Sequence, residues 1–105
     1  MRRSGTSYAH PLVVLIVSRT ADPVLRFGVS AGRSVGDAIR RNRAKRRIRA
    51  ILAHLHPFIA SGWNVIVLAR GRIHSASHRD LHNALVTLCS RAGILTTPPD
   101  DLYLP

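Results

Sequence analysis

Three short segments of this chain have the composition or the apolar spacing of β-strands. Residues 12–17 are continuous and rich in β-branched side chains, which predicts a buried strand. Residues 25–30 alternate between apolar and polar positions, and the turn-forming residues 20–23 before them predict a hairpin of these two strands. Residues 63–69 are apolar almost throughout and predict a third strand.

Two longer segments have the periodicity of helices. Residues 35–55 predict a long helix that ends before Pro57. A last helix is expected to begin at a cap formed by Ser75 or Ser77 and to end near Gly93. The apolar face of the long helix consists of Ala44, Ile48, Ile51, Leu52 and Leu55, and that of the last helix of Leu81, Leu85, Leu88 and Ala92.

The order of these elements predicts the fold class. Strand–strand–helix–strand–helix indicates an α/β (α+β) sandwich in which helices pack on one small β-sheet. The long helix joins two strands that should be parallel, which makes a β-α-β crossover. A length of 105 residues suits one domain over 1–105, with an irregular tail at 96–105 that is rich in Pro and Asp.

Charge is the property that most restricts the function. Lys and Arg number 16 against five acidic residues, so the net charge is +11, and all but one of the cations are Arg. Such a surface repels itself and predicts a polyanionic partner, and Arg suits the geometry of phosphate. The longest apolar run, 11–17, is too short to cross a membrane, so we expect nucleic acid rather than membrane. A single cysteine, Cys89, fits the reducing cytosol and predicts a cytoplasmic protein.

Eight of the 16 cations lie in residues 33–49, where Asp37 is the single acidic residue. On a helix they form a ridge opposite the apolar face. Cations one turn apart repel each other, so the ridge predicts an anionic ligand, and the alternative is a solvated basic surface. Charge alone leaves DNA and RNA open. The ridge consists of Asn42, Lys45, Arg46 and Arg49, flanked by Arg43.

Residues 41–49, RNRAKRRIR, resemble the RNR signature of the bacterial ribonuclease P protein family. RFGVS at 26–30 and VGDA at 35–38 are similar to two further segments of that family, in the same order and with similar spacing. NVIVLAR at 64–70 and the helix ending RAG at 91–93 fit as well. The resemblance therefore covers about residues 5–95, nearly the whole chain.

The resemblance implies a fold like that of domain 2 of ribosomal protein S5, and an RNA–protein enzyme that removes the 5′ leader of precursor tRNA. In this family the RNA subunit performs Mg²⁺-assisted hydrolysis. The protein would supply neither catalytic residues nor a metal site, and one protein would serve one RNA. Members usually begin with a further basic helix whose phenylalanines wall one side of the leader cleft. We expect the sequence from Met1 to lack this helix, so that either translation starts upstream of Met1 or the leader cleft is incomplete.

Residue roles follow from the same resemblance. Six residues of the predicted long helix would contact the RNA subunit: Arg41, Asn42, Arg43, Lys45, Arg46 and Arg49. Phe27, Arg33 and Arg70 are candidates for contact with the leader, although Phe27 is equally well explained as part of the core.

Three alternative functions remain open from the residues. His74, His78 and His82 have the four-residue spacing of zinc ligands on a helix, but a solvated helix face is the favoured interpretation. A ribosomal or other structural RNA-binding protein of the same fold would carry similar charge. A stand-alone nuclease is disfavoured because the five Asp residues are scattered.

Overall fold

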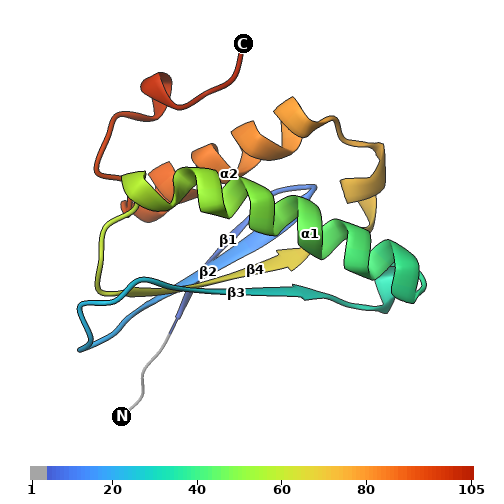
Figure 1. Ribbon diagram of the computed structural model, residues 1–105, viewed down its shortest axis with the longest axis horizontal. Coiled ribbons are helices and arrows are strands. Elements are labelled where there is room, and N and C mark those ends of the chain that lie inside the picture. Colours follow the sequence, from blue (N-terminus) through green and yellow to red (C-terminus); the bar gives the residue numbers. More distant parts are fainter. Residues whose placement is uncertain (1–4) are drawn as a thin grey trace.

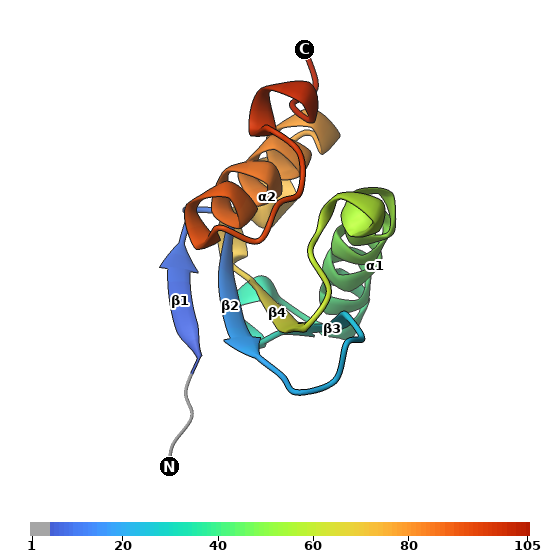
Figure 2. The same cartoon turned by 90° about the vertical axis from the view of Figure 1, so that its left-hand side faces the viewer.

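The computed structural model describes residues 5–105 and has a four-stranded sheet with both long helices on one face (Figures 1 and 2). The strands are β1 (Thr6–Ala9), β2 (Val13–Arg19), β3 (Arg26–Ala31) and β4 (Trp63–Ala69). The helices are α1 (Ala38–Leu55) and α2 (His78–Ala92), and short 3₁₀ turns connect or follow them. This mixed sheet with two helices confirms the predicted α+β class. The prediction that the family's N-terminal helix is absent concerns the chain before β1. Residues 1–4 there lie outside the part that the structure describes.

The strand order is β1-β2-β4-β3, so the predicted hairpin is wrong. β4 lies between β2 and β3, antiparallel to β2 and parallel to β3. The predicted β-α-β crossover is therefore confirmed, with β3 and β4 as its parallel strands. The connection over residues 20–25 is long enough for β3 to pass beyond β4. The apolar sequence of β4 suits a position between two neighbouring strands.

The first strand, β1, was not predicted from the sequence. It pairs antiparallel with β2 at the edge of the sheet, from Thr6 opposite Val17 to Ala9 opposite Val14. Three of its four residues are exposed, so it lacks the apolar periodicity that reveals a strand in a sequence. Backbone pairing with β2 therefore defines this element, and its side chains contribute little to the core.

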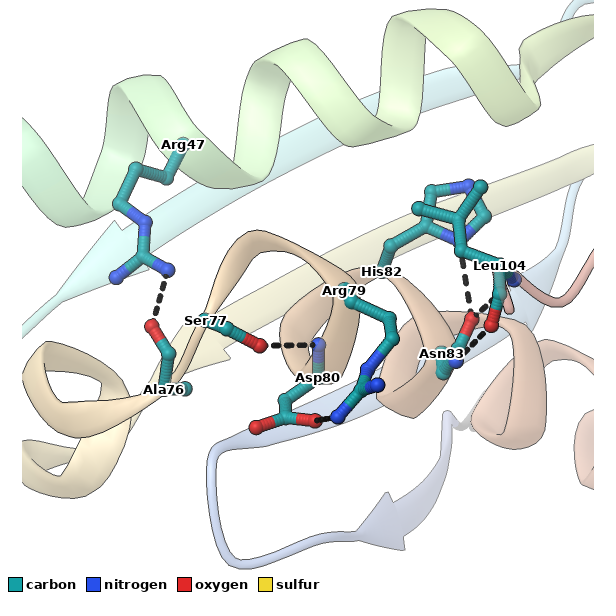
Figure 3. A network of polar contacts seen from close by, with 8 residues as sticks. All are labelled: Arg47, Ala76, Ser77, Arg79, Asp80, His82, Asn83 and Leu104. Atoms are coloured by element: carbon teal, nitrogen blue, oxygen red, sulfur yellow. Dashed lines mark hydrogen bonds and ion pairs between the residues drawn. The ribbon is translucent and has the colours of Figure 1, made fainter.

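Both helices begin where a side chain caps them. The predicted start at Val35 is three residues early, because residues 33–35 form a 3₁₀ turn and Gly36 has a φ of 129°. The Asp37 carboxylate then accepts a hydrogen bond of 2.9 Å from the Arg40 amide and caps α1. Ser77 caps α2 in the same way through the Asp80 amide (Figure 3), and Gly93 ends it with a left-handed φ of 72°.

The core lies between the sheet and the two helices. Alternate residues of β2 and β4 point into it, and all five predicted apolar residues of α1 are buried. Neither α1 nor α2 covers the other face of the sheet (Figure 2), and Ile66, which is 42% exposed, belongs to that face. In the part of the chain that the structure describes, no helix is both long and apolar enough to cross a membrane.

The tail at 96–105 is more ordered than the sequence predicted. It contains a short 3₁₀ turn over Pro99–Asp101, and Leu102 is buried. Asn83 of α2 donates to the Leu104 carbonyl oxygen at 2.9 Å and accepts from the Leu104 amide at 2.8 Å (Figure 3). Because these bonds satisfy both backbone groups of Leu104, the tail is held against α2.

Candidate RNA interface

The six residues that the sequence assigned to RNA all lie on α1, and none of them is fully buried. Asn42, Arg43, Arg46 and Arg49 are exposed, and Arg41 and Lys45 are half-buried. Arg41 and Lys45 lie toward β3, where they line a shallow pocket of about 190 Å³ beside Ala31. Because side chains four residues apart lie above one another on a helix, these residues form two rows. One row consists of Arg41, Lys45 and Arg49, and the other of Asn42 and Arg46. Arg43 lies on the flank toward α2. We call these six residues the α1 basic face.

The α1 basic face has no acidic partner within residues 5–105. The ion pairs there are Arg26 with Asp22 and Arg79 with Asp80, and neither involves α1. Asp37, the acidic residue nearest in sequence, accepts the backbone amide of Arg40 as the helix cap. Uncompensated cations at one-turn spacing repel each other, and an anion that bridges them relieves the repulsion.

Arg47 differs from the other cations of α1 because the protein uses it internally. Its guanidinium donates a hydrogen bond of 2.7 Å to the Ala76 carbonyl oxygen (Figure 3) and one of 2.8 Å to that of Ile73, and the side chain is half-buried. Both acceptors belong to the segment between β4 and α2. Arg47 therefore anchors α1 to that segment, and its guanidinium is oriented away from the α1 basic face.

Two of the three candidate leader residues lie at one edge of the sheet. Arg33 and Arg70 are exposed and follow the carboxyl ends of the parallel strands β3 and β4. Their segments are tightly packed, since a Cβ at Gly71 would lie 2.8 Å from the Ser34 carbonyl oxygen. Arg72, which was not among the predicted site residues, lines a pocket of about 700 Å³ beside Arg70, and the Arg-Gly-Arg spacing is its one signal in the sequence.

Phe27, the third candidate, is separate from these two arginines. It lies near the start of β3, about 13 Å along the strand from its carboxyl end. Its partner in the register is the buried Val65, so the ring is on the helix-covered side of the sheet, half-buried. The ring packs edge-to-face against His56, with 5.6 Å between centroids. The structure therefore groups Phe27 with the carboxyl end of α1.

The three histidines with zinc-like spacing do not share one helix face. His74 precedes α2 in the 3₁₀ segment Gly71–Ser75, and its ring contacts the Val35 carbonyl oxygen. His82 is 2% exposed, which contradicts the predicted solvated face, and its ring lies 5.5 Å from that of His54 and 6.2 Å from that of His78. No three His, Cys, Asp or Glu side chains within the described range are arranged to hold a metal ion.

Folding should depend on pH through His82. Its Nε2 has no hydrogen-bond partner among residues 5–105, and Nδ1 lies 3.4 Å from the Asn83 side-chain oxygen. Burial lowers the pKa of His82 from its usual 6.5, and His54 and His78 lower it further, while Asn83 acts in the opposite direction. Below pH 6.5 the His82 imidazole therefore binds a proton more readily in the unfolded chain than in the folded chain. The free energy of unfolding should fall as the pH drops below 6.5.

Urea unfolding of the protein and of His82→Leu at a series of pH values tests this expectation. The difference in unfolding free energy between the two should be constant above pH 6.5 and should shift in favour of the variant below it. Parallel curves over the whole range would show that His82 does not couple folding to protonation.

Known proteins with similar sequence include ribonuclease P protein components. The family model for Ribonuclease P matches residues 1–93. The ribonuclease P protein component of Clostridium botulinum (strain Loch Maree / Type A3) is 32% identical over 93 residues, which cover 88% of this chain and 84% of that protein. The component of Herpetosiphon aurantiacus is 32% identical over 94 residues, covering 90% of this chain and 76% of that protein.

Solved structures agree with these sequence matches. The RNase P protein of Staphylococcus aureus superposes with a TM-score of 0.76 at 25% identity, covering 86% of this chain and 83% of that chain. The RNase P protein from Thermotoga maritima shares the fold, with a TM-score of 0.75 at 24% identity and 83% of each chain covered. Since the family model spans most of the sequence and these relatives match over most of their length, the chain belongs to the ribonuclease P protein family.

Proposed function

We propose that this chain binds the RNA subunit of ribonuclease P through the α1 basic face and assists removal of the 5′ leader from precursor tRNA. One observation supports the assignment most strongly. The RNR segment lies on a helix whose apolar side is buried, so its exposed cations and Asn42 are held together as one rigid surface. Forked guanidinium groups suit phosphates, and the Asn42 amide can both donate to and accept from a base edge or a 2′-hydroxyl.

In this proposal the chemistry belongs to the RNA subunit with Mg²⁺, and the protein acts by charge and position. RNA subunit and precursor tRNA are both polyanions, so their association is opposed by phosphate repulsion. A protein of net charge +11 between them offsets that repulsion and reduces the Mg²⁺ that the complex needs. We assign one protein to one RNA in the cytoplasm, with Arg33 and Arg70 as the residues nearest the leader.

A ribosomal or other structural RNA-binding role would use the same charges, but the family match does not favour it. A stand-alone nuclease would need acid–base or metal-binding groups of its own. The described acidic residues are Asp22, Asp37, Asp80, Asp100 and Asp101, of which the first three cap a helix or pair with a nearby Arg. Both alternatives give distinct results in one assay.

Cleavage of precursor tRNA by the RNA subunit at low Mg²⁺ tests the proposal. The RNA alone should cut slowly, and adding the protein should raise kcat/KM by about tenfold or more. A tenfold increase corresponds to a gain of about 1.4 kcal/mol in binding of the transition state. A structural RNA-binding protein would give no rescue, and a nuclease would cut without the RNA. Arg46→Ala on α1 should weaken the rescue, whereas Arg79→Ala, which removes the same charge from α2, should preserve it.

A further inference from the structure

An apolar pocket of about 400 Å³ lies at the carboxyl end of α1. Figure 1 shows that this end of α1 and the start of β3 lie at the same end of the molecule. The pocket combines a strand, the last turns of the helix and the chain that follows it, so no single segment of the sequence reveals it. Its lining residues are Phe27, Arg49, Leu52, Ala53, His56 and Pro57.

The lining has the chemistry of a site for a flat aromatic ligand. Most of it is carbon, and the rings of Phe27 and His56 meet at 77° with 5.6 Å between centroids, which gives the pocket two aromatic walls. Its volume is in the range of small-ligand pockets, which begins at about 300 Å³. Nucleobases stack on such rings regardless of sequence, because every base has a π-face.

The charge around the pocket favours an anionic occupant. Arg49 is exposed and lines the pocket, and it ends the row of cations that includes Arg41 and Lys45. An anionic group held at Arg49 would therefore leave an attached ring directly beside the apolar walls, which is the layout of a nucleotide. A second copy of this chain is a poor occupant, since two proteins of net charge +11 repel each other.

We infer that this pocket takes the base of one unpaired nucleotide of the ribonuclease P RNA subunit, with its phosphate at Arg49. The inference rests on the proposed function and adds a stacking contact to an interface otherwise made of charge. Stacking and charge respond differently to salt. Loss of a phosphate contact lowers the slope of affinity against salt, whereas loss of a stacked base lowers affinity at every salt concentration by the same factor.

Affinity for the RNA subunit should be measured at several salt concentrations for Phe27→Leu and His56→Leu. Each should bind about 5-fold more weakly with an unchanged salt slope, the low end of the effect of losing one base–aromatic stack. Tyr103→Leu, an aromatic side chain 37% exposed on the C-terminal tail, is the matched control and should bind normally. Because Phe27 also touches the core, the exposed His56 provides a variant that leaves the core intact.

Ultraviolet cross-linking of the complex, followed by mass spectrometry of the joined peptides, identifies the contact directly. We expect a nucleotide of the RNA subunit on Phe27 or His56. Normal affinity in both variants without such a cross-link would overturn the inference and leave the proposed function standing. A cross-link to precursor tRNA instead would overturn the choice of occupant. Failure of the unaltered protein to bind the RNA subunit would overturn both, and that measurement comes first.

Discussion

Binding to the ribonuclease P RNA subunit should weaken by about 500-fold when the salt concentration rises from 50 to 200 mM, if the five cations of the α1 basic face each contact one phosphate as on duplex DNA. The expectation follows from the α1 basic face, whose cations have no acidic partner among the described residues. Each phosphate that a cation neutralises releases counterions, and added salt opposes that release. Affinity measured across this range gives the slope directly, and a flat profile would contradict an interface made of charge.

A double variant, Arg46→Ala with Arg49→Ala, should reduce that slope by about 2, because each phosphate contact contributes about 1. Both side chains are exposed on α1, so their loss should not disturb the core. Two further variants serve as controls, one for charge outside α1 and one for stacking. Arg79→Ala removes a similar charge from α2 and should preserve the slope. Phe27→Leu should lower affinity without changing the slope, so charge and stacking can be separated.

Replacing Ile48 by Ala should lower the free energy of unfolding by about 2–5 kcal/mol. Ile48 is fully buried on the side of α1 that faces the sheet, so the change removes apolar contacts and leaves a cavity. Its neighbours in sequence are Arg47, which anchors α1, and Arg49, which lies on the basic face. RNA affinity should fall with stability at temperatures where the variant partly unfolds.

The matched control is Ile39→Ala on the same helix. Ile39 is 79% exposed in the first turn of α1, so the same change removes almost no buried surface. Its effect on the free energy of unfolding should stay within about 0.5 kcal/mol. Urea denaturation of both variants measures the difference. Equal losses would show that α1 does not pack on the sheet as described.

The site was only partly predictable from sequence. Placing residues 41–49 on a helix correctly predicted that Asn42, Arg46 and Arg49 are exposed, because the helical period alone sets which residues lie opposite the apolar face. The same reasoning could not separate Arg47 from the other cations, since its acceptors are 26 and 29 residues away in sequence. The pocket that Phe27 and His56 share could not be predicted for the same reason, because one residue lies on a strand and the other at a helix end, far apart in sequence.

The sequence by itself determined the elements with a strong local signal. β4 and the apolar face of α1 agree with the prediction, as does the end of α2 at Gly93, because side-chain periodicity and capping act within a few residues. Only the tertiary structure decided that β4 lies between β2 and β3, that β1 exists, and that His82 is buried. Those outcomes depend on backbone pairing and packing between segments far apart in the chain, which local patterns do not encode.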